Sequence, residues 1–127
     1  EMCIRDRINT PDINNIDNDI ELIISLNNLS IATSGNYRNY YFDQDNFFHH
    51  ELNPNTGYPV ISNTGSVSVI SRESCMDADA LSTMLYVIDS SLTYDIVDKI
   101  NVAESLIIKI AEDGSFKKEF SKNFPKN

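Results

Sequence analysis

Short β-prone segments bounded by turn-forming residues dominate the pattern of hydrophobic and polar positions along the chain. In GSVSVIS, Val67 and Val69 alternate with Ser66 and Ser68, which predicts a half-buried strand. Aromatic residues flank the polar tip 43–46 in YYFDQDNFFHHEL, which predicts a hairpin. Further strands are predicted by apolar or β-branched residues at 20–24, 29–35, 105–110 and 116–120.

Two helices interrupt these strands. Ser74 with Asp77 three residues later resembles a capping box, and residues 76–88 have a helical pattern that begins there. At about 100° per residue, the apolar side chains of this helix fill one broad arc: Met76, Ala80, Leu81, Met84, Leu85, Val87 and Ile88. Residues 92–100 predict a second, shorter helix. Strands, then two helices, then a closing hairpin predict an α+β fold, with helices packed on a mixed or antiparallel sheet.

Composition is that of a globular domain and argues against two classes of function. The 127 residues suit one domain, and 41% hydrophobic residues are enough to form a core. A net charge of −9 and a pI near 4.4 argue against a nucleic-acid surface, which needs clustered Lys and Arg. Phosphate ligands stay compatible with this charge, because a divalent cation held by carboxylates can bridge two anionic partners. No apolar run approaches the roughly 20 residues that span a bilayer.

The beginning of the chain, EMCIRDR, has no periodicity and no pattern in common with the rest of the sequence. It also equals the translation of a transposon end that is used to prepare sequencing libraries. We therefore expect residues 1–7 to be a non-native read-through segment and residues 8–127 to be the natural part. A second assembly of the same locus that encodes this segment inside a longer frame would contradict the expectation.

The stretch DADALSTML could hold a metal ion. Asp79 and Thr83 are four residues apart, so on a helix they lie on one face with Cβ atoms about 5–6 Å apart. A carboxylate and a hydroxyl at this spacing can reach one Mg²⁺ ion at about 2.0–2.1 Å. Spacing alone favours the commoner arrangement, a solvated Asp and a Thr bonded to its own helix. Asp77, in the first turn, is expected to cap the helix.

Two loop segments have the polar residues of a ligand site, although each is locally ordinary. In ATSGNY, Gly35 after Ser34 permits a left-handed turn, which could direct N–H groups at a phosphate or ring carbonyl or could simply end a strand. In HHELNPNTGYP, strand alternation sends His49 and His50 to opposite sides, so only one of them can face a site. Residues 53–57 predict a compact turn.

These motifs, in this order, resemble those of one family, the FAD:protein FMN transferases (ApbE-like, formerly called thiamine-biosynthesis lipoproteins). The family has A-T-S-G-[DN]-Y, H-x-x-D-P-x-T-G-x-P and A-D-A-x-x-T, and this chain has ATSGNY, HELNPNTGYP and ADALST. Asn53 replaces the usual Asp before the proline, which keeps the turn-forming oxygen and removes a charge. Family members are much longer, so the resemblance implies the C-terminal part of a single α+β, T-fold-related domain.

The resemblance implies a role for each matching residue. Asp79 and Thr83 match the family's side-chain ligands of Mg²⁺. His50 matches a histidine proposed to assist catalysis, which leaves His49 as the structural one.

A second group of matching residues is implied to lie near the flavin. Leu52 matches a position that lines the FAD pocket. Ser34, Gly35 and Thr56 fall at motif positions close to the flavin. These four residues are therefore expected to help bind FAD as a substrate.

The implied reaction is Mg²⁺-dependent transfer of FMN from FAD to a Thr or Ser hydroxyl of a target protein, with release of AMP. The target is expected to be a flavoprotein subunit of a membrane redox complex, and the enzyme is expected to be extracytoplasmic and lipid-anchored. Two alternatives stay open, namely a Mg²⁺-dependent FAD pyrophosphatase and a non-catalytic flavin-binding protein or inactive fragment. This chain alone is expected to be inactive, because half of the family's site is missing from it.

Overall fold

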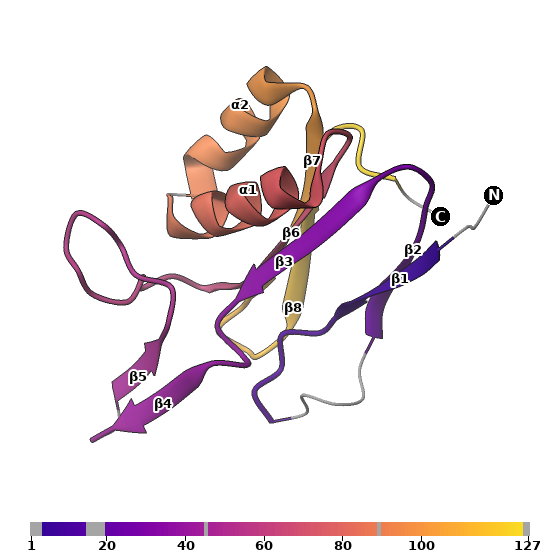
Figure 1. Ribbon diagram of the computed structural model, residues 1–127. Coiled ribbons are helices and arrows are strands. Elements are labelled where there is room, and N and C mark those ends of the chain that lie inside the picture. Colours follow the sequence, from indigo (N-terminus) through magenta and orange to yellow (C-terminus); the bar gives the residue numbers. More distant parts are fainter. Residues whose placement is uncertain (1–3, 15–19, 45, 89, 126–127) are drawn as a thin grey trace.

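Four antiparallel strands form the central sheet of the computed structural model, which describes residues 4–14, 20–44, 46–88 and 90–125 (Figure 1). The order across the sheet is β3 (Ser30–Gly35), β6 (Thr64–Ser71), β7 (Ala103–Ile110) and β8 (Phe116–Phe120). Two helices, α1 (Cys75–Val87) and α2 (Ser90–Ile100), connect β6 to β7. The predicted α+β class, with helices packed on an antiparallel sheet, is confirmed.

A two-stranded ribbon, β1 (Ile4–Asn9) and β2 (Ile20–Leu26), lies against the face of the sheet opposite the helices. Lys118 of β8 forms a 2.6 Å ion pair with Glu21 of β2, which ties the ribbon to the sheet edge. The sequence pattern predicts β2 but not β1, because charged residues interrupt IRDRIN. Part of the segment 1–7 thus pairs with β2, and its non-native origin stays a prediction.

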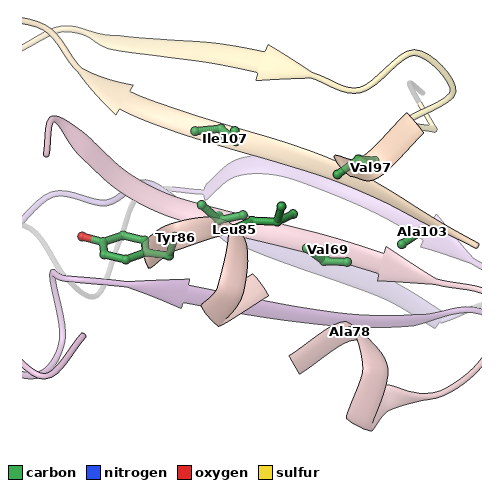
Figure 2. Packing of buried hydrophobic residues seen from close by; sticks show 8 residues of the cluster. Val69, Ala78, Leu85, Tyr86, Val97, Ala103 and Ile107 are labelled. Carbon is green, nitrogen blue, oxygen red and sulfur yellow. The ribbon is translucent and has the colours of Figure 1, made fainter. Parts of the chain in front are cut away.

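Both faces of the inner strands β6 and β7 are largely buried, because a different layer covers each side of the sheet. Against the helices lies one hydrophobic cluster, shown in Figure 2: Val67, Val69, Ala78, Leu85, Tyr86, Val97, Ala103 and Ile107. Beneath the ribbon lies another: Ile8, Ile24, Leu26, Ile70, Leu106, Ile108 and Phe124. The half-buried character predicted for β6 is therefore wrong, because all of its residues are buried, Ser66 and Ser68 included.

The predicted hairpin is formed by β4 (Tyr40–Asp43) and β5 (Asn46–His49), and it projects from the sheet (Figure 1). The predicted turn comes after it, because the Asn53 carbonyl oxygen accepts a hydrogen bond from the Gly57 N–H at 2.8 Å. Gly57 has a φ of 72°, a left-handed conformation that glycine adopts without steric cost. Both predicted features are confirmed.

Helix α1 begins as predicted but packs through a partly different face. The Ser74 hydroxyl accepts a hydrogen bond from the Asp77 N–H at 3.1 Å, which confirms the predicted cap. The buried side of the helix consists of Ala78, Ser82, Leu85 and Tyr86. The predicted apolar arc is only partly the packing face: Leu85 is buried, whereas Met76 is 76% exposed and Met84 is exposed as well. Small residues at the contact allow α1 to lie close to the sheet, and this closeness decides which face is buried.

The C-terminal elements agree with the sequence pattern. Helix α2 begins at Ser90, two residues before the predicted start, and ends at Ile100 as predicted. The predicted turn between β7 and β8 is present, with Gly114 at a φ of 81°. Within the residues that the structure describes, no helix is long and apolar enough to cross a membrane.

Tyr86 is a buried phenol whose hydroxyl donates a hydrogen bond to the Thr64 carbonyl oxygen at 3.0 Å. Burial raises the pKa of Tyr86, and the nearby Glu51 carboxylate raises it further. The folded state therefore holds this proton more tightly than the unfolded state. The stability due to Tyr86 is complete below about pH 10, the ordinary tyrosine value, and is lost as the pH rises above it.

Tyr86→Phe is expected to lower the free energy of unfolding by about 1 kcal/mol at pH 7, because one buried hydrogen bond is lost. The difference between the two proteins is expected to shrink above about pH 10, where the unfolded wild-type chain gains from ionising Tyr86. Urea unfolding at pH 7 and at a pH above about 10 measures this difference. Tyr41→Phe, at an exposed tyrosine, is the control. A difference that stays constant with pH would contradict the raised pKa.

Candidate functional site

Four segments that are far apart in the sequence converge on one polar cavity of about 420 Å³. They are the end of β1, the end of β3 with the loop after it, the residues that come after β5, and the first turns of α1. The lining residues are Arg7, Asn9, Thr33, Ser34, Gly35, Tyr37, Arg38, Asn39, His50, Glu51, Asp79 and Thr83. The predicted site residues that meet here are Ser34, Gly35, His50, Asp79 and Thr83.

A chain of hydroxyl groups ties α1 to β3 at the cavity wall. The Ser34 hydroxyl lies 2.9 Å from the hydroxyl oxygens of both Ser82 and Thr83. Ser82 in turn donates to the Asp79 carbonyl oxygen at 2.9 Å. Because that bond uses the one proton of Ser82, Ser34 must donate to Ser82, and Thr83 must donate to Ser34. The Thr83 oxygen therefore keeps its lone pairs free for a ligand.

Asp79 and Thr83 supply the oxygen ligands that Mg²⁺ prefers, one turn apart on α1. They form only part of a coordination shell, since the described residues contain no cluster of three or more His, Cys, Asp or Glu side chains that could hold a metal. In phosphate-transfer sites, Mg²⁺ is usually held by one or two carboxylates together with waters and substrate phosphates. A carboxylate and a free hydroxyl oxygen fit an ion bound together with a phosphate ligand.

Gly35 ends β3 at a position with no space for a side chain. A Cβ atom on Gly35 would lie 2.7 Å from the Tyr37 ring and 2.9 Å from the Gly65 carbonyl oxygen. The predicted left-handed turn is wrong, because Gly35 pairs with Ser66 as the last residue of β3 and has no positive φ. Its small size, and not its conformational freedom, sets the position of the neighbouring Ser34.

The two histidines lie in different environments. His49 is 7% exposed, its Nε2 lies 2.9 Å from the Val60 carbonyl oxygen, and its ring meets Tyr86 edge-on. His50 is about half exposed and lines the cavity. A structural role suits the surroundings of His49, and His50 is the imidazole available to a ligand.

Glu51 is a cavity residue that the sequence interpretation missed. Its side chain is 7% exposed, and its Oε1 lies 3.3 Å from the Nε2 of His50. Strand alternation would place it on the side of His49, but β5 ends at His49 and the chain bends at the next residue. His50 and Glu51 therefore both line the cavity. The signal that could have revealed it is an acidic residue directly after the motif histidine.

Arginines add positive charge to the cavity wall. Arg38 lines the cavity, and its Cζ lies 5.8 Å from the centre of the Tyr37 ring. Arg7 also lines it and belongs to the segment predicted to be non-native. A guanidinium group in a polar cavity suits a phosphate ligand.

Leu52 and Thr56 lie outside this cavity. Leu52 is 52% exposed, and Thr56 borders a second cavity of about 650 Å³ between the loop before β6 and the end of α1. Within the turn, the Thr56 hydroxyl accepts from the Tyr58 N–H at 3.3 Å, and Asn53 Oδ1 accepts from the Asn55 N–H at 2.9 Å. The turn-forming oxygen expected of Asn53 is present. Flavin contacts of Leu52 and Thr56 stay predictions.

The region that forms this cavity matches a known family. A model of the ApbE family matches residues 5–107. The chain belongs to the ApbE family. The match includes every residue of the cavity, and it begins inside the segment predicted to be non-native.

Two curated relatives of this ApbE-family chain share one name. The FAD:protein FMN transferase of Haemophilus influenzae is 38% identical over 107 residues, which cover 84% of this chain and 30% of that protein. The FAD:protein FMN transferase of Escherichia coli K12 is 34% identical over 108 residues, which cover 85% of this chain and 30% of that protein. The chain thus spans about 30% of the length of these relatives.

Solved ApbE structures align with nearly all of the chain. The flavin transferase ApbE from Vibrio cholerae aligns with 96% of this chain and 37% of its own, with a TM-score of 0.77 and 32% identity. The ApbE protein from Thermotoga maritima aligns with 98% of this chain and 38% of its own, with a TM-score of 0.76 and 29% identity. The predicted relation to the ApbE fold is confirmed.

Ser34→Ala and Ser66→Ala compare two buried serines that differ in their hydrogen bonds. Ser34 has two hydroxyl partners, whereas Ser66 Oγ has no partner among the described residues. Ser34→Ala is expected to lower the free energy of unfolding by about 1–2 kcal/mol, and Ser66→Ala to leave it unchanged or raise it. Chemical denaturation measures both values. Equal losses would contradict the hydroxyl chain.

Proposed function

We propose that this chain supplies the metal-binding and proton-transfer side of an FAD:protein FMN transferase. The proposed reaction moves FMN from FAD to a Thr or Ser hydroxyl of a target flavoprotein and releases AMP. The observation that supports it most is that Asp79, Thr83 and His50 line a single cavity in a chain of the ApbE family. The name shared by the curated relatives is the reason to propose flavin transfer and not another phosphoryl transfer.

Asp79 and Thr83 would hold Mg²⁺ beside the pyrophosphate of FAD. When bound, the ion would neutralise negative charge on the phosphate oxygens and on the leaving group. The chain's own part is to hold these ligands in place. Thr83 donates its proton to Ser34, which fixes the hydroxyl and leaves its lone pairs available. Arg38, in the same wall, would pair with a phosphate oxygen.

His50 would accept the proton of the attacking hydroxyl, because it is the half-exposed imidazole of the cavity. The bond that forms joins the target oxygen to the phosphorus of FMN. The bond that breaks joins this phosphorus to the bridging oxygen, which leaves with AMP. The proton stays on His50 until solvent removes it, and the flavin ring is neither oxidised nor reduced.

The proposal is tested by incubating the full-length protein that contains this chain with FAD, Mg²⁺ and a purified target domain. The expected result is flavin fluorescence on the target band in a denaturing gel, and its loss when Mg²⁺ is omitted. Release of free FMN and AMP without labelled target would indicate FAD hydrolysis. Retention of intact FAD would indicate a binding protein, and either of these results would contradict flavin transfer.

Asp79→Asn is expected to reduce FMN transfer on the order of 100-fold or more, because a neutral amide replaces the charged ligand of the metal. Asp77→Asn is the matched control. It removes the same charge from the same helix, but Asp77 pairs with the capping Ser74 and does not line the cavity. Initial rates over a range of Mg²⁺ concentrations compare the two variants. Full activity of Asp79→Asn would remove the metal assignment.

His50→Gln is expected to lower transfer by about 10²–10⁴-fold without a change in thermal stability. His49→Gln is expected to lower the melting temperature, because His49 is buried and bonds both the Val60 carbonyl oxygen and the Glu51 N–H. Rates and thermal melts of the two variants separate a role in proton transfer from a role in packing. A wild-type rate for His50→Gln would exclude it as the base.

A further inference from the structure

Glu51 is a buried acidic side chain to which the reaction above assigns no role. Its carboxylate lies in the cavity wall, 7% exposed, and its Oε1 lies 3.3 Å from the Nε2 of the His50 ring. Removing a carboxylate from water without a partner is costly, so buried carboxylates are normally paired. The contact between Glu51 and His50 therefore requires a physical explanation.

We propose that Glu51 is a positioning residue, whose carboxylate, 3.3 Å from the Nε2 of His50, favours a proton on that nitrogen and leaves Nδ1 as the proton acceptor. This inference deepens the transferase function proposed above and rests on it. The Glu51 Oε1 lies beside Nε2, and Nδ1 is the other ring nitrogen. A neutral imidazole with its proton on one nitrogen accepts only at the other, so the contact selects the tautomer.

The surroundings of Glu51 hold it in this position. Its backbone N–H donates to the Nδ1 of His49 at 3.2 Å, and its carbonyl oxygen accepts from the Val60 N–H at 3.0 Å. Its carboxylate also lies near Tyr86, whose pKa burial raises and the Glu51 charge raises further. The backbone of Glu51 is thus anchored to the buried His49, while its side chain reaches the exposed ring of His50. Glu51 therefore contacts both histidines, His49 through its backbone N–H and His50 through its carboxylate.

The consequence for the transfer step is electrostatic. The target hydroxyl gives its proton to Nδ1 of His50 as its oxygen bonds to the FMN phosphorus and the bond to the AMP oxygen breaks. His50 becomes an imidazolium ion, and the Glu51 carboxylate 3.3 Å away stabilises this charge. The charge develops in the transition state and is absent from the bound substrate. Its stabilisation is therefore expected to raise kcat and to leave KM unchanged.

Glu51→Gln and Glu104→Gln, made in the full-length protein, form a matched pair. Glu104 is equally buried, but it contacts Ser121 and Arg72 outside the cavity. Glu51→Gln is expected to lower kcat about 10- to 100-fold and to leave KM for FAD within about twofold. Glu104→Gln is expected to leave both constants unchanged. A wild-type kcat for Glu51→Gln, or a loss confined to KM or to the Mg²⁺ requirement, would overturn the proposal.

A double-mutant cycle tests whether Glu51 acts through His50. In a His50→Ala background, Glu51→Gln is expected to cause no further loss of rate, because the imidazole that it positions is gone. If Glu51→Gln lowers the rate by the same factor with and without His50, the carboxylate acts independently and the proposal is wrong.

A spectroscopic measurement on the full-length protein needs no turnover. The imidazole nitrogen-15 signals of His50 are those that disappear in His50→Gln, which separates them from the signals of His49, the other of the 2 histidines of this chain. At alkaline pH, where imidazole is neutral, the proton of His50 is expected on Nε2, and a proton on Nδ1 would overturn the proposal. These spectra do not depend on FAD. They therefore decide the role of Glu51 separately from the gel assay, whose failure would overturn the transferase function instead.

Discussion

The position of the whole site depends on how closely α1 approaches β3. Ala78 and Ser82 are fully buried at this contact, and the Ser34 hydroxyl reaches the hydroxyls of Ser82 and Thr83 at 2.9 Å. At Gly35, next to Ser34, the surrounding atoms leave no space for a Cβ atom. A bulkier residue at these positions would push the helix away from the strand and would separate Asp79 and Thr83 from the rest of the cavity. Several residues of the ATSGNY and ADALST motifs are therefore packing residues that make the ligand positions possible.

Elements whose ends are marked by local chemistry can be predicted from the sequence. The Ser74 cap and the glycines at 57 and 114 determine a helix start and two turns through interactions within a few residues. The buried face of α1 cannot be predicted in this way. Hydrophobicity favours Met76 and Met84, but the small residues are buried because they allow closer packing. The burial of the β6 serines cannot be predicted from the local sequence either, because it results from the layers that cover both sides of this strand.

The candidate site can be predicted where its residues belong to recognisable motifs. Ser34, His50 and Asp79 come from three separate motifs, and the fold brings all three to one cavity. Glu51 occupies an unspecified position of its motif, so its place in the cavity follows from the bend after β5 and not from the motif itself. Leu52 belongs to the same motif as His50 but is 52% exposed and does not line the cavity. A motif thus identifies the segment that forms a site, and the local path of the backbone decides which of its side chains take part.

Charge within the cavity explains how so acidic a chain could bind a pyrophosphate. The net charge is −9, and two cavity residues, Glu51 and Asp79, are themselves acidic. In the proposed function Mg²⁺ would be the partner of Asp79, and the His50 ring, which gains a positive charge during transfer, is the partner of Glu51. Arg38 then remains available for the phosphate oxygens. The carboxylates would thus be offset by Mg²⁺ and by the His50 ring, so the local pairing of groups, and not the charge of the whole chain, determines which ligand the cavity can accept.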